Sequence, residues 1–278
     1  MASKKSVKNY IFSEALWGID DFLCSGNPIR MTAASRCERR DSFPGKREEH
    51  PASQKTQVTG RPSHSHNENK KSSRNAKEDA LLALYKENKN CRRCPLGNAR
   101  LNFVFGVGSP EARLVFVGEG PGYDEDHKGE PFVGRAGQLL NKIIAAMKMR
   151  REDVYIANIT KCHPMIDPSN PHKRGNDRPP TNEEMSCCMP ILEEQLKIIS
   201  PDVISTLGAT AAKGLLRTEE PIGVLRGKIF DFELSDGKKI KLVPTYHPAA
   251  LLRNPALKKP CWEDIKKVIA LLKNNSDV

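Results

Sequence analysis

Four cysteines in the middle of the chain could together hold one metal centre. Cys91 and Cys94 form the pair in CRRCP, Cys162 ends NITKC, and Cys188 follows after 25 intervening residues. Two cysteines at C-x-x-C spacing also serve as redox pairs, so the pair by itself decides little. Four thiolates suit zinc and an iron–sulfur cluster equally by ligand count. These residues predict a metal centre and leave its metal open.

Two further segments offer groups that could bind a small ligand. In GEGPG, three glycines form a loop whose backbone can approach a ligand closely and present N–H groups, at Gly118, Gly120 and Gly122. The loop is not a Walker loop, because no Gly-Lys-Ser/Thr follows, and the dinucleotide spacing G-x-G-x-x-G is absent. Asn158 ends VYIAN and His247 begins HPAALLRNP, which adds an amide and an imidazole.

The elements that must position these groups alternate along the chain. Short β-branched runs predict strands at 114–118, 154–158, 203–208 and 240–246. Longer helical patterns lie near 134–148, 182–199, 209–216 and 262–273. This alternation predicts a parallel sheet between two helical layers, an α/β/α sandwich. Ligands of such sheets sit beyond the C-terminal strand ends, where GEGPG, Asn158 and His247 all fall.

The chain divides into three segments. Apolar residues at three- and four-residue steps predict a short amphipathic helix at 10–23, within an N-terminal segment that spans residues 1–26. Polar and charged residues dominate 27–76, which we expect to be a disordered basic linker. The folded domain then spans 77–278. A replication or repair protein is the candidate partner of the N-terminal helix, although no defensible motif identifies one.

Composition narrows the kind of partner. The 278 residues carry a formal net charge of +11, which favours an anionic partner, most commonly nucleic acid. The apolar N-terminal stretch is interrupted by Glu14, Asp20 and Asp21, so neither a secretory signal nor a membrane span is predicted. We therefore expect a cytoplasmic monomer with no membrane partner and with its eight cysteines reduced.

Taken together, GEGPGYDEDHKGEPFVGRAGQLL, HPAALLRNP and the four cysteines resemble the family 4, iron–sulfur uracil-DNA glycosylases across residues 80–272. The resemblance implies the glycosylase α/β/α sandwich with a central four-stranded parallel sheet. It implies a monofunctional enzyme that hydrolyses the N-glycosidic bond of deoxyuridine in DNA, releases uracil and leaves an abasic site, the first step of base excision repair. It also favours a [4Fe-4S] cluster on Cys91, Cys94, Cys162 and Cys188, with Cys187 as a competitor for the last position.

The resemblance implies roles for the pocket residues. Phe132 would stack on the base, whereas without the family it is as readily a core aromatic. Asn158 would read uracil, because an amide pairs with O4 and N3–H and cytosine presents the opposite pattern. His247 would donate to uracil O2 as negative charge develops on the leaving base. The first motif maps onto Glu119, Gly120, Pro121 and Gly122.

The resemblance leaves alternatives open for the residue that helps the water, for Glu125 and for the two leucines. Gly120 fills the position where the classical uracil-DNA glycosylases have a carboxylate. The resemblance therefore implies that Glu119 or Asn176 helps the water, or that an oxocarbenium ion captures it unaided. Glu125 would crowd the C5 methyl of thymine, or serve only as a carboxylate at a helix start. In HPAALLRNP, Leu251 and Leu252 would fill the gap left by the flipped base, and one of them is expected to pack inward instead. Arg253 would lie near the DNA phosphates.

The insertion IDPSNPHKRGNDRPP makes the spacing between Cys162 and Cys188 longer than the family pattern. A related branch of the superfamily carries a basic insertion whose histidine traps the sugar, which invites comparison with His172, Lys173 and Arg174. We expect no such role, because the spacing around His172 differs and Cys162 stands where that branch has a histidine.

Two rival functions remain. One is a DNA-binding protein without catalytic activity that is stabilised by the same metal site. The presence of Asn158 and His247 argues against this function. The other is a zinc-stabilised nucleotide-binding or nucleotide-hydrolysing α/β domain, which would be colourless where an iron–sulfur protein is brown.

Overall fold

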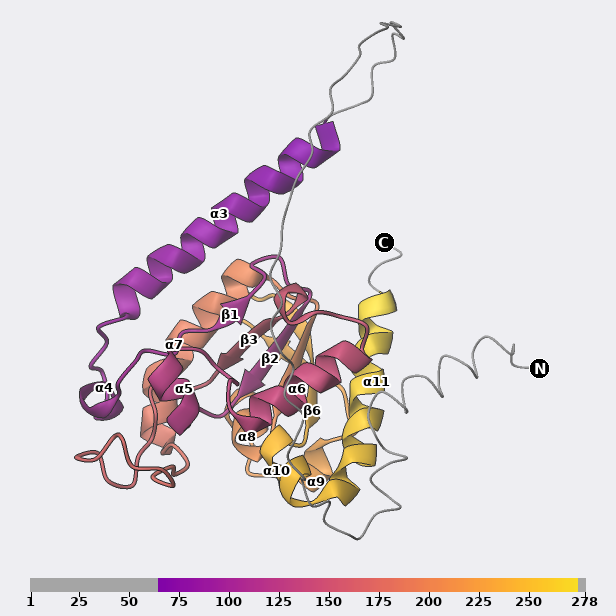
Figure 1. The fold of residues 1–278 in the computed structure, drawn as a ribbon. Helices are drawn as coiled ribbons and strands as arrows, with labels where there is room; N and C mark the ends of the chain where they lie inside the picture. The colour runs from indigo at the N-terminus through magenta and orange to yellow at the C-terminus, as the bar shows by residue number, and fades with distance from the viewer. Residues whose placement is uncertain (1–64, 275–278) are drawn as a thin grey trace, which may run out of the picture. The chain divides into compact units, whose positions relative to one another are not determined.

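The computed structural model describes residues 65–274 (Figure 1). The amphipathic helix expected at 10–23 and most of the linker expected at 27–76 lie outside the described residues. Helix α3 (Ser65–Asn88) begins inside that linker segment. Lys, Glu and Ala are good helix formers, and extending a helix is far easier than nucleating one. The buried Leu81 anchors this helix in the core.

A six-stranded sheet forms the centre of the molecule, in the order β1-β3-β2-β4-β6-β5. The four middle strands run parallel, and the two edge strands are antiparallel to their neighbours. The strands are β1 (Val107–Gly108), β2 (Leu114–Gly118), β3 (Tyr155–Asn158), β4 (Val203–Leu207), β5 (Phe230–Glu233) and β6 (Lys239–Thr245).

The predicted four-stranded parallel sheet is confirmed, and β1 and β5 add two strands that the sequence pattern did not predict. Strand β1 has only two residues, too few to show a period. Strand β5 reads FDFE and is half exposed along its length, as edge strands often are. By contrast, β2, β3 and β4 are buried throughout, which gives the continuous apolar runs typical of parallel strands.

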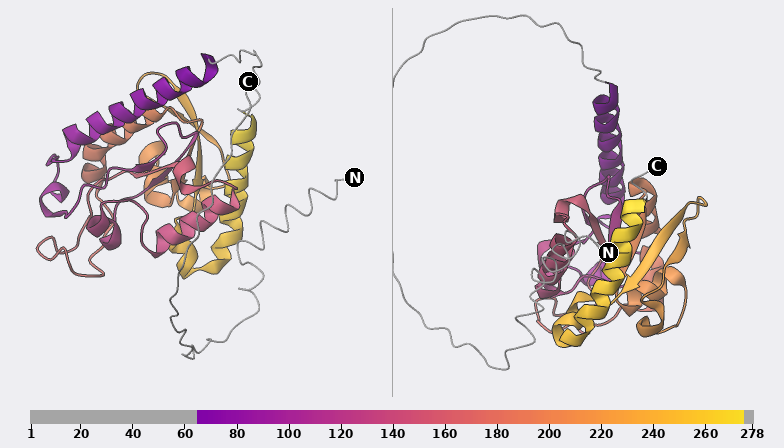
Figure 2. Two further views of the ribbon diagram at one scale, coloured as in Figure 1. Left: turned by 45° about the horizontal axis from the view of Figure 1, so that its top comes forward. Right: turned by 90° about the vertical axis from the view of Figure 1, so that its right-hand side faces the viewer.

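Helices cover both faces of this sheet, which makes the three-layer α/β/α architecture (Figures 1 and 2). Val115 and Val117 belong to one buried cluster with Leu192 of α7 and Leu215 of α8. Side chains alternate along a strand, so Leu114 and Phe116 point to the opposite face, on the side of α6 and α11. The longer helices are α6 (Arg135–Ala146), α7 (Asn182–Ile199), α8 (Ala209–Leu216) and α11 (Lys258–Asn274).

Short helices fill the connections. They are α4 (Leu96–Ala99), α5 (Tyr123–Lys128), α9 (Ile222–Leu225) and α10 (Pro248–Arg253), with 3-10 turns at η1 (Arg151–Asp153) and η2 (Pro255–Leu257). None of the helices in the described residues is long and apolar enough to cross a membrane.

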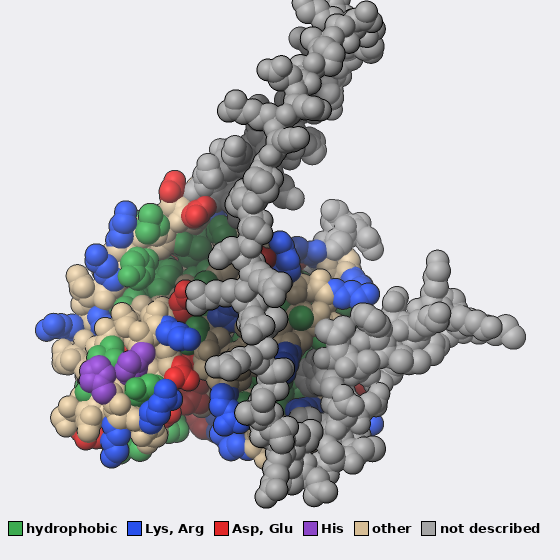
Figure 3. Space-filling view, in the orientation of Figure 1, with side chains coloured by type: hydrophobic (Ala, Val, Ile, Leu, Met, Phe, Trp, Pro, Cys, Tyr) green, Lys and Arg blue, Asp and Glu red, His purple; other side chains and the backbone are tan. Residues whose placement is uncertain are grey.

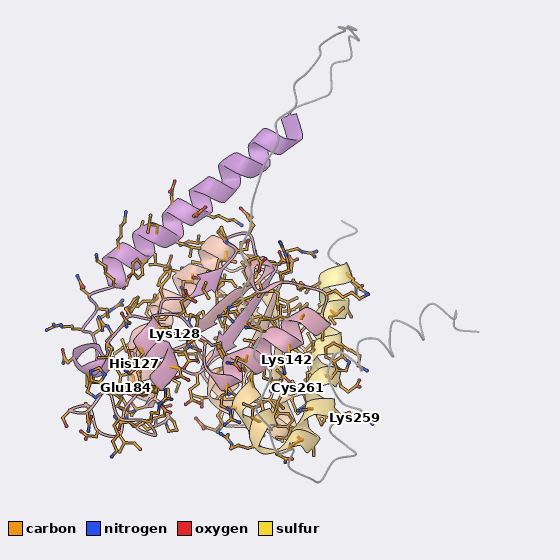
Figure 4. All side chains as sticks on the ribbon, in the orientation of Figure 1. His127, Lys128, Lys142, Glu184, Lys259 and Cys261 are labelled. Carbon is orange, nitrogen blue, oxygen red and sulfur yellow. The ribbon has the colours of Figure 1, made fainter. Side chains whose placement is uncertain are left out.

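The start of α7 is fixed by a capping box. The Thr181 hydroxyl accepts the Glu184 N–H at 3.2 Å, and the Glu184 carboxylate accepts the Thr181 N–H at 2.8 Å. Arg178 donates to the same carboxylate through Nη1 and Nη2 at 2.9 and 2.7 Å. This contact is the main cause of the lowered pKa of Glu184. Glu184, labelled in Figure 4, thereby sets the register of the helix that carries Cys188.

Candidate active site

The carboxyl ends of β2 and β3 bring two of the expected base-binding residues together. Gly118 and Asn158 are paired at the last position of these parallel strands. A Cβ atom on Gly118 would lie 2.4 Å from Asn158 Oδ1 and 2.6 Å from Cζ of the Phe132 ring. Only a residue without a side chain leaves room for both groups at this position. Asn158 and Phe132 therefore border one space at the strand ends.

Asn158 carries a polar atom with no partner in the described structure. The side chain is 1% exposed, and its Oδ1 accepts no hydrogen bond from any residue between 65 and 274. Leaving a buried polar atom unpaired costs about 1–3 kcal/mol. An oxygen in that state favours a ligand that brings its own N–H group.

Phe132 is held in a conformation that non-glycine residues rarely adopt. Its φ is +53°, in the left-handed region, and the side chain is buried. Glu125 fixes the following turn, since its Oε1 accepts the N–H groups of Val133 and Gly134 at 2.9 and 3.0 Å. Its other oxygen accepts the N–H of Gly122 at 3.3 Å. Glu125 thus joins the glycine loop to the Phe132 turn.

His247 lies beside Phe132 on the other side of the strand ends. The two rings are 5.6 Å apart at 33°. The N–H of Ala249 donates to His247 Nδ1 at 3.1 Å, which assigns the proton of the neutral ring to Nε2. Burial lowers the pKa of His247 to about 4, and the charge of Arg253 adds to the effect. The residue is a neutral imidazole with one N–H donor at physiological pH.

A buried ion pair anchors the strand that leads to His247. Thr245 donates its hydroxyl to Asp264 Oδ2 at 2.8 Å, and Arg226 binds both oxygens of Asp264 at 3.0 and 2.8 Å. Burial raises the pKa of Asp264, and the Arg226 guanidinium opposes that shift. Arg226 also lies over the ring of Tyr246, with 5.5 Å to its centroid. The network fixes the residues immediately before His247.

The four expected metal ligands lie near one another, although they come from distant positions in the sequence. Cys91 follows α3, Cys94 precedes α4, and both are half buried, whereas Cys162 and Cys188 are buried. Burial is the main cause that raises the pKa values of Cys162 and Cys188; the nearby Cys188 and Cys94 add to the shift of Cys162, and Cys94 and Cys91 add to that of Cys188. The fold therefore gathers these four thiols from four separate segments.

Cationic and N–H groups surround the thiols. Arg100 Nη1 donates to Cys162 Sγ, and Arg93 Nε donates to Cys91 Sγ, each at 3.4 Å. Burial raises the pKa of Cys162 to about 12. Burial also pushes the pKa of Cys91 upward, but hydrogen bonds and charge from Arg93 outweigh it and lower the value overall.

The four cysteines can be compared with the ligands that a metal centre needs. Between residues 65 and 274, no three His, Cys, Asp or Glu side chains converge on a single ion. A four-iron cluster does not need such convergence, because each of its four cysteines binds a different iron. Thiolate ligands also carry negative charge, which Arg93 and Arg100 are placed to offset. The four thiols and their cationic surroundings therefore fit a centre held by thiolates.

Comparison with known proteins identifies the family. The family model described as the uracil DNA glycosylase superfamily matches residues 105–266. The chain is 42% identical over 194 residues to the type-4 uracil-DNA glycosylase of Archaeoglobus fulgidus, covering 68% of this chain and 92% of that protein.

The type-4 uracil-DNA glycosylase of Thermotoga maritima is 42% identical over 200 residues, covering 71% of this chain and 97% of that protein. That of Pyrobaculum aerophilum is 40% identical over 189 residues, 66% of this chain and 91% of that protein.

The chain belongs to the uracil DNA glycosylase superfamily.

The glycine loop of this superfamily member packs closely on Thr160. Glu119 is half buried, and its carbonyl accepts the backbone N–H and the hydroxyl of Thr160 at 3.1 and 3.3 Å. A Cβ atom on Gly120 would lie 2.4 Å from the same hydroxyl, so the loop packs closely on Thr160.

Asn176 is buried inside the insertion, and its amide is already engaged. Its Oδ1 accepts the N–H of Asp167, and its Nδ2 donates to the carbonyls of Asp167 and Asn170. All of these contacts stay within the insertion, at distances of 2.8–3.1 Å. In the described structure Asn176 thus shapes this loop through both its amide oxygen and its amide nitrogen.

The two leucines of HPAALLRNP differ in exposure, and Leu251 is the one that packs inward, as expected for one of the pair. Leu251 is completely buried, because α10 turns it toward the core. Leu252 is 41% exposed and Arg253 is exposed on the same short helix. Any apolar wedge from this segment is therefore Leu252 alone.

The insertion folds back onto α5 of this glycosylase-superfamily chain. His172 Nδ1 and His127 Nε2 lie 3.1 Å apart, and the Arg174 guanidinium lies 4.4 Å from the centroid of the Tyr123 ring. His127 is labelled in Figure 4, and Figure 3 shows histidine side chains grouped on this face among Lys and Arg side chains. His172 thus engages a second histidine, a contact that spacing along the sequence could not indicate.

Sequence reasoning missed the buried polar groups behind the pocket. Lys161 is completely buried, and its Nζ donates to the carbonyl of Asn158 at 2.8 Å and to Gln195 Oε1 at 2.6 Å. His163 lies between Asp126 and Asp177, at 3.5 and 2.6 Å. The only sequence signal was position, since Lys161 and His163 flank Cys162 directly after a buried strand.

Proposed function

We propose that this protein is a monofunctional uracil-DNA glycosylase. It hydrolyses the N-glycosidic bond of deoxyuridine in DNA, releases uracil and leaves an abasic site, which is the first step of base excision repair. The observation that carries this proposal is the buried, unpartnered Oδ1 of Asn158 beside Phe132 and the neutral His247. An acceptor, a stacking surface and a donor in one small space suit a planar base with an N–H group flanked by two carbonyls.

Asn158 would select uracil by hydrogen bonding. Its Oδ1 accepts the N3–H of uracil, and its amide N–H donates to O4. Cytosine presents an acceptor at N3 and a donor at N4, so the same amide orientation would face two repulsive contacts. Phe132 would stack on the base and contribute roughly 1–3 kcal/mol without regard to its identity. Selectivity against cytosine therefore rests on Asn158.

His247 would stabilise the leaving base. When the C1′–N1 bond breaks, the electron pair passes to uracil and the deoxyribose becomes positively charged. A fixed N–H donor at uracil O2 stabilises that negative charge without a proton transfer. The tautomer set by Ala249 leaves Nε2–H as this donor. Water then adds to C1′ of the sugar and loses a proton; we propose that the Glu119 carboxylate accepts this proton rather than Asn176, whose amide is engaged within its own loop.

Glu125 would exclude thymine. Its carboxylate is fixed by the N–H groups of Gly122, Val133 and Gly134, so it cannot easily swing away from a methyl group at C5 of the base. The same three contacts position Phe132, which makes Glu125 both a support of the pocket and a boundary of it.

The enzyme would act on a nucleotide that has left the base stack. Leu252 would occupy the gap and Arg253 would contact phosphate, while other Lys and Arg side chains add salt-dependent binding without sequence preference.

The metal centre would be a [4Fe-4S] cluster on Cys91, Cys94, Cys162 and Cys188. When bound, it supplies a structural link rather than hydrolytic chemistry. These cysteines come from the ends of α3 and β3, the start of α4 and the middle of α7, so one cluster would tie the N-terminal helix of the domain to the core. Cys187 donates to the carbonyl of Arg93 at 3.5 Å, which gives it another partner.

Single-turnover cleavage of a labelled oligonucleotide tests the proposal. Wild type should cut a strand with one U after alkali treatment and leave matched T and C strands intact. Asn158→Ala should lose at least a hundredfold in rate, as is typical when one preorganised hydrogen-bonding group is removed. Asn182→Ala, on the exposed start of α7, is the control for an asparagine lost elsewhere. A folded, brown wild type that cleaves nothing would support the silent DNA-binding rival.

A further inference from the structure

Arg151 is a half-buried arginine whose side chain reaches the turn that carries Phe132. It begins η1, and its Nη2 donates to the carbonyl of Pro131 at 2.6 Å. Its Nη1 donates to Oδ1 of Asn141, on α6, at 2.9 Å. The Pro131 carbonyl belongs to the peptide group that joins Pro131 to Phe132. The guanidinium therefore holds the main chain immediately before the residue that we expect to stack on the base.

The Phe132 turn needs support from outside, because its conformation is unfavourable by itself. A φ of +53° at a non-glycine residue persists only where the surrounding structure enforces it. Glu125 accepts the two backbone N–H groups that follow Phe132, whereas Arg151 donates to the carbonyl that precedes it. Helix α6 packs against the same turn, since a Cβ atom on Gly137 would lie 1.9 Å from the Phe132 carbonyl oxygen. The main chain of Phe132 is thus fixed on both sides.

Arg151 also connects this turn to the strand that carries Asn158. The 3-10 turn that Arg151 begins ends at Asp153, and β3 then runs from Tyr155 to Asn158. One side chain therefore joins the turn of the stacking ring to the segment that leads into the base-reading strand. Accurate placement matters for stacking, because a gap of about 0.5–1 Å already forfeits a quarter to a half of a dispersion contact.

We propose that Arg151 is a positioning residue that fixes the Phe132 ring for stacking on the flipped base. Its guanidinium ends at a main-chain carbonyl and an amide oxygen, so it acts through the turn and does not touch the base. A planar guanidinium can hold two acceptors at a fixed angle, which the single point charge of a lysine cannot do. The inference rests on the proposed uracil-DNA glycosylase function and adds a residue that determines how tightly the base is held.

The test compares Arg151→Met with Arg150→Met. Arg150 is the matched control, because it is the neighbouring arginine, is exposed and pairs with Asp153 instead. Wild type is first assayed for single-turnover cleavage of a U strand, which tests the proposed function by itself. Each variant is then measured for its melting temperature, its affinity for free uracil by calorimetry, and its affinity for an oligonucleotide with a tetrahydrofuran abasic site. The abasic strand has no base to stack.

We expect Arg151→Met to weaken uracil binding about tenfold and to slow cleavage of the U strand by a similar factor, as for loss of one charge-assisted hydrogen bond. Affinity for the abasic strand should stay within about twofold of wild type, and Arg150→Met should match wild type in every assay. Arg151→Lys, which keeps the charge and one donor, should recover part of the loss. Asn141→Ala removes only the second anchor of the guanidinium and should weaken uracil binding by less; it serves if Arg151→Met does not fold.

A double-mutant cycle shows whether Arg151 acts through the ring. In a Phe132→Ala background, Arg151→Met should slow cleavage no further, because the ring that it positions is gone. The inference is overturned if a folded Arg151→Met binds uracil as wild type does, even with a lowered melting temperature, since the arginine would then be purely structural. An equal loss with and without the Phe132 ring, or a parallel loss of abasic-strand binding, would also overturn it. A wild type that cleaves no U would instead refute the proposed function, and this inference with it.

Discussion

The charge state of His247 gives a prediction that separates two ways of stabilising the leaving uracil. A neutral imidazole donates one hydrogen bond, whereas an imidazolium would add a full positive charge. Burial and Arg253 lower the pKa of His247 from 6.5 to about 4, and Ala249 holds the neutral ring with its proton on Nε2. We therefore predict that the active enzyme uses the neutral form.

The magnitude follows from that pKa. The difference between a pKa of 6.5 and one of about 4 corresponds to roughly 3 kcal/mol in favour of the neutral ring. Because His247 is partly exposed, solvent screening reduces this free energy. At pH 7 only about one molecule in a thousand would carry the imidazolium. The single-turnover rate should therefore stay level from about pH 5.5 to 8.5 and fall only as the pH drops toward 4. Loss of the donor in His247→Ala should cost about a hundredfold to a thousandfold in rate.

The same pKa affects stability in a defined direction. Below pH 6.5 the unfolded chain binds a proton that the folded His247 does not, so the free energy of unfolding should decrease as the pH falls from 6.5 to about 4. His247→Ala should lack this component of the pH dependence.

The assay is single-turnover cleavage of a labelled U strand across this pH range, with enzyme in excess so that binding does not limit the rate. The charged-donor alternative makes the opposite prediction, a rate that declines as the pH rises through about 6.5. A decline of that kind in wild type, absent from His247→Ala, would refute the neutral-donor mechanism.

Three further predictions concern the surroundings of the pocket. Gly118→Ala should weaken binding of free uracil by more than tenfold in a calorimetric titration while the iron content is unchanged, since the new methyl group meets Asn158 and Phe132; unchanged affinity would contradict the close approach. Asp264→Asn should destabilise the fold by about 3–5 kcal/mol in denaturant titration, because Arg226 then lacks its buried partner; a loss below about 1 kcal/mol would show the pair to be dispensable. Leu252→Ala should slow cleavage in duplex more than in single strands with unchanged stability, whereas Leu251→Ala should cost about 2–5 kcal/mol of stability; equal effects of Leu252→Ala on both substrates would argue against a wedge.

The sequence by itself predicted the architecture because the central strands have a distinctive composition. Strands buried on both faces read as continuous apolar runs, as in β2, β3 and β4, and β6 is buried over its last four residues. All four strands were found with ends within two residues of their observed positions. The same reasoning placed GEGPG, Asn158 and His247 at one edge of the sheet, because parallel strands end on the same side. The four cysteines were recognisable from residue type and spacing, and the structure gathers them.

Tertiary structure decided what individual side chains do. Residue type could not tell Leu251 from Leu252, because the orientation of a six-residue helix depends on what it packs against. Nor could it show that the amide of Asn176 is occupied within its own loop.

The roles of Glu125, Lys161 and Asp264 depend on partners far away in sequence or on main-chain groups, which have no sequence signature. Spacing along a chain records local periodicity, whereas the hydrogen bonds that fix a binding pocket form only after separate segments have packed together.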